Sequence, residues 1–307
     1  MNILVTGGAG FIGSNIVDSY LDLGHKVVVI DDLSTGRRHN VNPNAVFIQM
    51  DIRDDDIERV FQQHRIEFVN HQAARGDVRA SLARPEEYAD VNIRGGIKLL
   101  ECCRKYGVKG FIYSSTGGCV YGEPLHVPTD EKHPMQPRDP YGASKACFEI
   151  YLATYKEMYG IPFTILRYPN VYGPRQNPFG EAGVVSIFAK KMLLDQDVVI
   201  NGTGNQERDF VFVADVVKAN LLVSEHSYNT EFNLGTGVGV NVNTIYRELK
   251  MIAGYKRDAI YGLLKAGEVR RSILTSTKIF NLCGWKPEIS LQEGLRKTVD
   301  HIKRYEV

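Results

Sequence analysis

One stretch near the start of the chain decides its fold: Asn2-Ile3-Leu4-Val5-Thr6-Gly7-Gly8-Ala9-Gly10-Phe11-Ile12-Gly13. Its pattern predicts a buried strand, a glycine turn and the first turn of a helix whose apolar period continues to Leu23. The glycines fit both G-x-x-G-x-x-G and G-x-G-x-x-G, a spacing that permits a tight turn and close backbone approach to a pyrophosphate. The cofactor contacts expected in this turn are Gly7, Gly10, Phe11, Ile12 and Gly13.

A second apolar run, Lys26 to Ile30, ends at Asp31. A carboxylate at this place can accept hydrogen bonds from the adenosine ribose and would repel a 2′-phosphate, so it favours NAD over NADP. Because strand, glycines, helix, strand and acid follow in this order, a dinucleotide site is favoured over a purely structural glycine turn. Residues after Asp31 and after the apolar runs 45–50 and 67–71 are expected to complete the cofactor cleft: Asp32, Asp51, Ile52, Gln72, Ala73 and Ala74.

Short apolar runs alternate with helical stretches through the first half of the chain, at 45–50, 67–71, 110–114 and 162–167. Such alternation predicts right-handed crossovers and an α/β fold with a Rossmann-type, doubly wound parallel sheet. Beyond Pro169, glycine, proline and polar residues increase and short strands mix with helices. We expect residues 1–169 to form the NAD-binding domain, with later segments about 205–235 returning to it, and residues 170–307 to form mainly a smaller C-terminal α/β substrate-binding domain.

Composition argues against several classes of partner. The net charge of +1 and the absence of a basic tract provide no surface for nucleic acid or for an anionic membrane. No apolar run approaches the ~18 residues of a membrane-spanning helix, and the first residues form a strand rather than a secretion signal. The five cysteines lack zinc-binding spacing, so no metal is expected. The sequence therefore predicts a cytoplasmic enzyme with reduced cysteines.

A second motif, Tyr141-Gly142-Ala143-Ser144-Lys145, places a phenol and an ammonium one helical turn apart. Asp139 and Pro140 are typical of an N-cap and a first helical residue, so Tyr141 is expected in the first turn of a helix. A phenolate at neutral pH requires a pKa about three units below the ordinary value, or ~4 kcal/mol. Lys145, a nicotinamide cation, a hydroxyl donor and the helix dipole together are expected to supply it. The alternative is an ordinary half-buried tyrosine and a solvated lysine.

Five motifs run along the chain: Thr6 to Gly13, Ser114 to Gly122, Tyr141 to Lys145, Leu166 to Gln176 and Arg208 to Val211. Together they resemble the extended short-chain dehydrogenase/reductases, and within that superfamily the NAD-dependent UDP-glucose 4-epimerases, over essentially the whole chain. The resemblance implies reversible epimerisation at C4 of a UDP-hexose, through transient oxidation to a 4-keto sugar with tightly bound NAD.

The resemblance also implies a role for individual residues. Thr116 and Tyr141 would contact the sugar O4, with Tyr141 as the base, while Lys145 would hold the nicotinamide ribose and lower the pKa of Tyr141. Tyr168 would join the cofactor contacts. The implied substrate contacts are Thr116, Tyr141, Asn170, Val184, Arg208, Lys265, Glu268 and Ser272.

Several positions refine this expectation. Gly117-Gly118 stand where the related 4,6-dehydratases carry Asp-Glu, so no carboxyl group is present to eliminate water. Lys265 and Glu268 replace the arginine and aspartate usual in the family, which predicts altered contacts to UDP. The small side chain of Ser272 is expected to leave room for a 2-acetamido group, so that N-acetylated sugars are also accepted.

Two alternatives and one partner remain as expectations. The alternatives are 4-epimerisation of another nucleotide sugar, such as UDP-glucuronate, and a non-enzymatic NAD-responsive regulator.

Arg75, Asp77 and Arg79 are expected to pair with one another at the rim of the site, although they could instead meet an unusual sugar substituent. The helix from Tyr141 to Tyr159 carries an outward apolar set that includes Phe148, Tyr151, Leu152 and Tyr155, and some of these must pack against its own sheet. By resemblance, this helix and the one before it are expected to form a homodimer interface.

Overall fold

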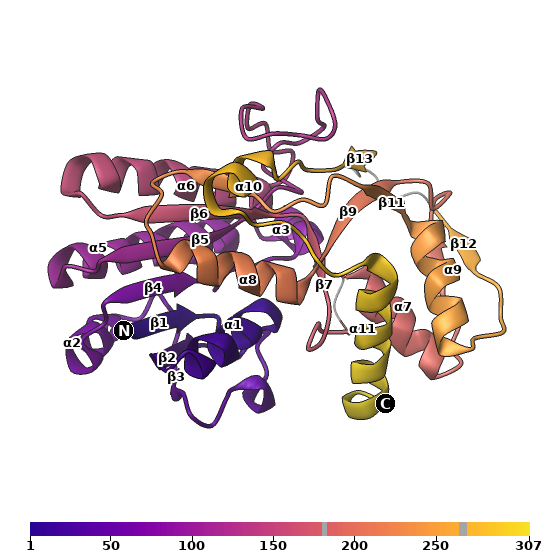
Figure 1. Cartoon of the computed structure of the whole chain (residues 1–307), viewed down its shortest axis with the longest axis horizontal. Helices are drawn as coiled ribbons and strands as arrows, with labels where there is room; N and C mark the ends of the chain where they lie inside the picture. The colour runs from indigo at the N-terminus through magenta and orange to yellow at the C-terminus, as the bar shows by residue number, and fades with distance from the viewer. Residues whose placement is uncertain (180–182, 264–268) are drawn as a thin grey trace.

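The computed structural model describes residues 1–179, 183–263 and 269–307. Its centre is a seven-stranded parallel sheet with the order β10-β6-β5-β4-β1-β2-β3 (Figure 1). The doubly wound α/β fold predicted from the sequence is confirmed. The strands are β1 (Asn2–Thr6), β2 (Lys26–Asp31), β3 (Val46–Gln49), β4 (Phe68–His71), β5 (Gly110–Thr116), β6 (Phe163–Tyr168) and β10 (Glu231–Asn233).

Alternate side chains of β1 pack on opposite faces of the sheet because successive strand residues point in opposite directions. Ile3 and Val5 join the core beneath α1 and α8, whereas Leu4 joins the core beneath α2, α5 and α6. These helices are α1 (Phe11–Asp22), α2 (Ile57–His64), α5 (Gly96–Tyr106), α6 (Pro140–Tyr159) and α8 (Val213–Ser224). Shorter turns connect them: η1 (Arg38–Asn40), α3 (Val78–Ala83), α4 (Pro85–Ala89) and the π-helical η2 (Asp90–Gly95).

Helix α6 presents a different face to the sheet than the sequence suggested. Phe148 and Leu152, expected to point outward, are buried against the sheet at 0% and 1% exposure. The side chains that α6 leaves exposed include Ile150, Tyr151 and Met158. The expectation was wrong for Phe148 and Leu152 because both faces of α6 are apolar and only the packing of α6 on the sheet distinguishes them.

The smaller part of the molecule contains two short sheets. One is four-stranded and joins β7 (Asn170–Tyr172), β9 (Glu207–Phe212), β11 (Gly239–Asn241) and β13 (Arg271–Ser272). The other pairs β8 (Val199–Asn201) with β12 (Ile260–Gly262). The surrounding helices are α7 (Val184–Leu193), α9 (Val242–Ala253), α10 (Thr277–Cys283) and α11 (Leu291–Tyr305).

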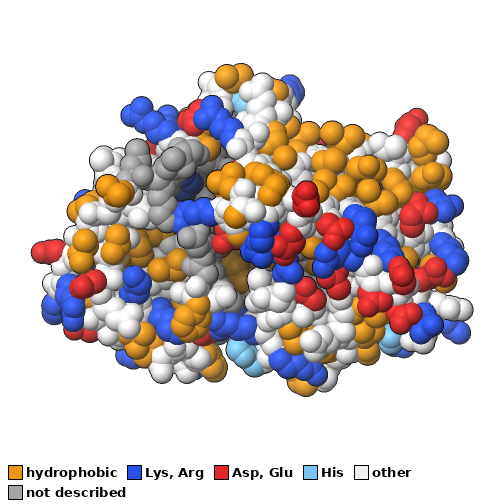
Figure 2. Space-filling view, turned by 180° about the vertical axis from the view of Figure 1, so that it is seen from behind, with side chains coloured by type: hydrophobic (Ala, Val, Ile, Leu, Met, Phe, Trp, Pro, Cys, Tyr) orange, Lys and Arg blue, Asp and Glu red, His pale blue; other side chains and the backbone are white. Residues whose placement is uncertain are grey.

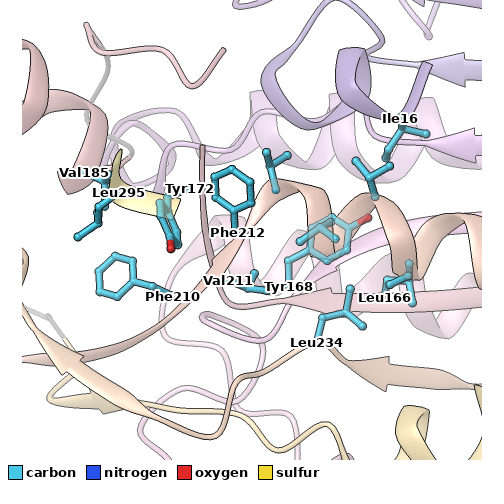
Figure 3. Packing of buried hydrophobic residues seen from close by; sticks show 14 of the residues in the cluster. Ile16, Leu166, Tyr168, Tyr172, Val185, Phe210, Val211, Phe212, Leu234 and Leu295 are labelled. Atoms are coloured by element: carbon cyan, nitrogen blue, oxygen red, sulfur yellow. The ribbon is translucent and has the colours of Figure 1, made fainter. Parts of the chain in front are cut away.

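One apolar core runs from the large sheet into this smaller part (Figure 3). Leu166 and Ile16 lie in the same cluster as Phe210 and Leu295, so the two parts share buried contacts. Within 205–235, α8 packs against α1 and β10 joins the large sheet, whereas β9 belongs to the four-stranded sheet. The expectation that segments of 205–235 return to the NAD-binding domain is therefore wrong for β9. The domain division near residue 169 stays a prediction.

Two further searches concern only the described residues. None of their helices combines the length and the apolar character needed to cross a membrane. They also contain no group of three or more histidine, cysteine or acidic side chains placed to hold a metal ion.

Candidate active site

The glycine turn lies where the strand order reverses. After β1 the chain continues to β2 on one side, while β4 flanks β1 on the other, and ligands of such sheets bind at the carboxyl ends of these strands. Gly7 has φ +69°, and a Cβ there would lie 2.7 Å from the backbone nitrogen of Ala73. A Cβ on Gly13 would lie 2.2 Å from the carbonyl oxygen of Gly7. Both positions thus require glycine for the close packing of turn, helix and strand.

Gly10 has a different role in the same turn. A Cβ there would meet only the carbonyl oxygen of Gly7, at 3.1 Å, so its outer face is open. Gly10 is also the N-cap of α1, and in the described structure no side chain caps this helix and its first turn carries no acidic residue. The N–H groups at the start of α1, from Phe11 and Ile12 onward, therefore fit an anion such as a pyrophosphate.

Asp31 completes this cradle at the end of β2. Its carboxylate accepts hydrogen bonds from the backbone N–H groups of Ala9 at 3.0 Å and Leu33 at 2.9 Å. Burial raises the pKa of Asp31, which these hydrogen bonds partly offset. Asp32 instead accepts from the backbone N–H of Ser34 at 2.9 Å and faces Arg75 at 3.6 Å. Asp31 and the glycine turn together fit a dinucleotide.

Gln72 and Tyr168 belong to one buried polar network under the cleft. The Gln72 amide donates to Asn70 Oδ1 at 2.6 Å and to the Tyr168 hydroxyl at 3.2 Å. The Tyr168 hydroxyl also accepts from the Asn220 amide at 3.0 Å, which links β6 to α8. The backbone N–H of Ala73, the neighbour of Ala74, donates to Thr6 Oγ1 at 3.3 Å. The structure thus brings these expected residues together at the switch point.

Asp51 and Ile52 lie near the end of β3. The Arg53 guanidinium donates to both carboxylate oxygens of Asp51, at 2.9 and 2.5 Å, and lowers its pKa. Ile52 is buried, and a Cβ on Gly95 would lie 2.7 Å from its side chain. The Asp51 carboxylate therefore stays charged beside the cleft.

Thr116, Tyr141 and Lys145 are brought together where β5 ends and α6 begins. Thr116 is the last residue of β5, and Tyr141 lies in the first turn of α6. The N-cap predicted at Asp139 is present, since its carboxylate accepts from the backbone N–H of Gly142 at 2.7 Å. One turn later, Lys145 is 3% exposed and donates to the carbonyl oxygen of Ser114 at 2.6 Å.

Burial dominates the electrostatics of Tyr141 and Lys145. Burial raises the pKa of its phenol, and the hydrogen bond with Thr116 lowers it by less. Burial also lowers the pKa of Lys145 to about 7, while the Glu149 carboxylate raises it. Burial disfavours the charged phenolate and so sets the direction of the Tyr141 pKa in the protein alone. The lowering expected from Lys145, the helix dipole and a nicotinamide cation together stays a prediction.

The expected substrate residues lie on the small sheet and at its edge. Ser272 of β13 is in register with Arg208 of β9, and Ser272 is buried. Asn170 of β7 pairs with Phe210 of the same β9. Val184 is the first residue of α7. Lys265 and Glu268 lie outside the described residues.

Arg75 and Asp77 do not pair as expected. Arg75 donates to Glu87 Oε1 at 2.9 Å, while Asp77 caps α3 by accepting from the backbone N–H of Arg79 at 2.8 Å. The expected pairing of Arg75 with Asp77 is therefore wrong, since Arg75 pairs with Glu87 and Asp77 serves as the N-cap of α3.

Cys119 is a residue of the site that sequence reasoning missed. Burial raises the pKa of its thiol to about 12, while the hydrogen bond with Thr116 and the charge of Arg208 lower that pKa by less. A Cβ on Gly142 would lie 3.0 Å from the Cβ of Cys119, so Cys119 packs against the first turn of α6. The one available signal was its position three residues after Thr116.

Comparisons with known proteins agree with this geometry. Residues 3–235 match the model of the NAD dependent epimerase/dehydratase family. The UDP-glucose 4-epimerase of Thermotoga maritima, solved with UDP-glucose, is 48% identical with a TM-score of 0.98, covering 100% of both chains. The UDP-glucose 4-epimerase of Thermus thermophilus, solved with NAD, is 43% identical with a TM-score of 0.95, again covering 100% of both chains. The UDP-N-acetylglucosamine 4-epimerase of Methanobrevibacter ruminantium, solved with UDP-N-acetylmuramic acid, is 35% identical with a TM-score of 0.93, covering 98% of this chain and 97% of that one.

Proposed function

The chain belongs to the NAD dependent epimerase/dehydratase family, and on that premise we propose that it is an NAD-dependent UDP-glucose 4-epimerase. It interconverts UDP-galactose and UDP-glucose through a transient 4-keto sugar. The observation that carries the proposal is the meeting of Thr116, Tyr141 and Lys145 beside the glycine cradle at the end of the parallel sheet. The 48% identical enzyme of Thermotoga maritima, solved with UDP-glucose, supports the substrate.

NAD, held by the glycine turn and Asp31, would supply the hydride acceptor, the hydride donor for the return step and a positive charge. The chain's own residues handle the proton. Tyr141 takes the proton from the sugar O4 and gives it back to the same oxygen, while the Thr116 hydroxyl holds O4 at the phenol. Lys145 holds the nicotinamide ribose. Because burial alone raises the pKa of Tyr141, the phenolate depends on positive charge brought close to it.

Residue 117 supports epimerisation rather than dehydration. A Cβ on Gly117 would lie 2.3 Å from Cδ1 of Leu274. A carboxylate side chain at position 117 therefore has no room without a shift of Leu274. The 4-keto sugar accordingly meets no acid or base from this position that would remove water.

Substrate breadth follows from Ser272. Its side chain is small and buried, and it lies beside Arg208 across the strand pair. We propose that the space beside Ser272 accepts a 2-acetamido group, so that the N-acetylated pair is also turned over. The similar enzyme of Methanobrevibacter ruminantium, which acts on UDP-N-acetylglucosamine, supports this breadth.

The function is tested by incubating the NAD-loaded protein with UDP-galactose and measuring UDP-glucose in a coupled assay. A panel that adds UDP-N-acetylgalactosamine and UDP-glucuronate, with product identification, ranks the substrates. Tyr141→Phe should lower kcat by about 10²–10⁴-fold while NAD stays bound, because a general base is lost. Tyr151→Phe is the matched control, since Tyr151 lies on the same helix but is 37% exposed. Equal activity of wild type and Tyr141→Phe, or no turnover of any sugar by wild type, contradicts the proposal.

A homodimer is the proposed assembly. Ile150 and Met158 of α6 are 60% and 65% exposed, and Leu82 of α3 is 65% exposed. Figure 2 shows hydrophobic side chains gathered at the upper right, over the end of the molecule that carries α5 and α6. An apolar face of this kind supports association with a second copy. Light scattering at micromolar concentration should give the dimer mass, and Ile150→Glu should give the monomer.

We also propose a cytoplasmic location. All five cysteines, from Cys102 to Cys283, are unpaired thiols, and adjacent Cys102 and Cys103 are buried. Reduced cysteines are typical of a reducing compartment. Fractionation of cells expressing the chain with a C-terminal tag should recover it with cytoplasmic markers.

A further inference from the structure

The ammonium of Lys145 lies in an unusual place for a charged group. Its side chain is 3% exposed, and Nζ donates to the carbonyl oxygen of Ser114 at 2.6 Å. An ammonium carries three N–H donors, and taking it out of water is costly unless the protein compensates the charge. The environment of Lys145 therefore has to replace lost hydration with other attractive groups.

The ring of Tyr113 is one such group. Lys145 Nζ lies 4.6 Å from the centroid of this ring, within the range of a cation–π interaction. Tyr113 directly precedes Ser114 in β5, so two adjacent residues of one strand supply the ring and the carbonyl oxygen that contact the ammonium. The ring is 0% exposed, which removes competing water.

Neighbouring rings hold Tyr113 in this orientation. Phe148 of α6 meets it edge-on, with centroids 4.8 Å apart, and His71 of β4 stacks on it at 5.7 Å and 25°. His71 is in turn hydrogen-bonded to Thr6 at 2.7 Å. A row of side chains thus runs from the glycine turn through His71 and Tyr113 to Lys145.

The hydroxyl of Tyr113 contributes nothing comparable. Among the described residues it is buried without a hydrogen-bond partner. An orphaned buried hydroxyl destabilises the fold, and phenylalanine would provide the same ring without it. What Lys145 contacts is the face of the ring.

We propose that Tyr113 is a positioning residue for the reaction, whose ring face holds the buried ammonium of Lys145 in its charged form beside Tyr141. Its catalytic consequence rests on the proposed function, because Lys145 matters to turnover only if the chain is an epimerase. Its effect on the charge of Lys145 does not depend on that function. The competing explanation is that the ring of Tyr113 only fills space between β5 and α6.

The groups around Lys145 determine the expected pH dependence. Glu149 acts on Lys145 from the same helix, and the ring of Tyr113 faces it from β5. His71, which stacks on Tyr113 from β4, is also affected by the charge of Lys145. Tyr141 and Cys147 of α6 lie near Tyr113. Burial lowers the pKa of His71 to about 3, so it stays neutral over the range tested. Glu149 is held by Arg167 of β6 and by Ser115, and neither contact involves Tyr113.

The direction of the pH effect follows from the lowered pKa of Lys145, which is about 7 in the fold and 10.5 for an ordinary lysine. A lysine whose pKa falls on folding destabilises the fold fully below its folded pKa, and this effect fades as pH rises toward the ordinary value. Removing the ring lowers the folded pKa further. The loss of stability should therefore be larger at low pH than at high pH.

The first measurement is the melting temperature of the full-length Tyr113→Phe and Tyr113→Leu proteins between about pH 5.5 and 9. We expect the gap between the two variants to widen as pH falls through about 7. In a Lys145→Met background, the gap should be the same at every pH. If Tyr113→Leu does not fold, Tyr113→Met replaces it. If the difference in melting temperature between the two variants does not depend on pH in either background, the proposal is wrong and the ring of Tyr113 only fills space. This measurement needs no turnover, so a wrong assignment of the reaction does not affect it.

The second measurement is the pH profile of kcat with UDP-galactose for the NAD-loaded enzymes. In Tyr113→Leu, the fall of kcat at high pH, where Lys145 loses its charge, should begin at a lower pH than in the wild type. For each pH unit of this shift, kcat on the alkaline side should fall by about tenfold. KM should change little. Tyr113→Phe should restore the wild-type alkaline limb. Loss of activity in Tyr113→Phe equal to that in Tyr113→Leu overturns the proposal, because the hydroxyl would then be the acting group.

Discussion

The backbone N–H of Ala9 donates a hydrogen bond to Oδ2 of Asp31 at 3.0 Å. This bond ties the turn after β1 to the end of β2, so the groups that fit a pyrophosphate and an adenosine ribose form one unit. Substitutions in the turn and at Asp31 can therefore be sorted by their effect: some should destabilise the fold, and others should only weaken NAD binding.

Gly13→Ala and Gly10→Ala should separate stability from cofactor binding. A Cβ at position 13 would lie 2.2 Å from the carbonyl oxygen of Gly7, whereas one at position 10 would meet that oxygen at 3.1 Å. We expect Gly13→Ala to destabilise the fold by about 1–3 kcal/mol or more through overpacking. Gly10→Ala should keep a near-native melting temperature but lose NAD, because the methyl group occupies the path of the pyrophosphate. Thermal unfolding and quantification of bound NAD check both; a folded, NAD-loaded Gly13→Ala protein would contradict this account.

Asp31→Asn should weaken NAD binding while Asp32→Asn serves as the control. Asp31 faces the turn, whereas Asp32 accepts from the backbone N–H of Ser34 and lies near Arg75. A hydrogen bond to a charged group contributes about 1.5–3 kcal/mol, so we expect about a tenfold to hundredfold rise in the Kd for NAD. The preference over NADP should narrow as well, since the carboxylate no longer repels a 2′-phosphate. Titration calorimetry with both cofactors measures this, and a larger effect from Asp32→Asn would refute the assignment.

Glu149→Gln should strongly destabilise the protein. Glu149 pairs with Arg167 at 2.5 Å, and their side chains are only 4% and 6% exposed. Removing one charge leaves the other buried and uncompensated, which costs about 3–5 kcal/mol. The control is Asp195→Asn, since Asp195 and its partner Arg257 are 69% and 47% exposed and such pairs contribute about 0–1 kcal/mol. Equal shifts of the urea midpoint for the two variants would be inconsistent with a buried ion pair.

Ser272→Tyr should narrow the substrate range. Ser272 is buried beside Arg208, and a phenol there would fill the space that we assign to the 2-acetamido group. We expect turnover of the N-acetylated pair to fall by at least about tenfold relative to UDP-galactose. Ser272→Gly should retain both activities. Kinetics with both sugar pairs measure this. If neither the wild type nor Ser272→Gly turns over the N-acetylated pair, Ser272 does not make room for a 2-acetamido group.

Much of the cofactor half was predictable because its signals are local. The glycine spacing, the acid at the end of the second apolar run and the Asp139-Pro140 cap depend on residues close together in the chain, and the structure contains β1, α1, β2 and α6 at these places. The resemblance to the extended dehydrogenase/reductases is confirmed by the family match over residues 3–235.

The misses have one physical origin. In the protein alone the pKa of Tyr141 is raised by burial, and the pentad Tyr141 to Lys145 does not reveal that burial. Asp77 turned away from Arg75 because a short helix required a cap. Phe148 is buried against the sheet, which the sequence did not reveal because both faces of α6 are apolar. Each outcome depends on neighbours that are distant in sequence.

The sequence by itself determined the parallel α/β fold, the dinucleotide turn from Gly7 to Gly13 and the presence of Thr116, Tyr141 and Lys145, because short-range pattern and backbone geometry carry that information. Only the tertiary structure decided what surrounds these groups. The Tyr113 ring lies over the ammonium of Lys145, and Gly117 lies against Leu274, which would have to shift to admit a side chain at position 117. These relations join β5, α6 and the loop after β13, and the charge of a buried group follows from the dielectric environment that such long-range packing creates.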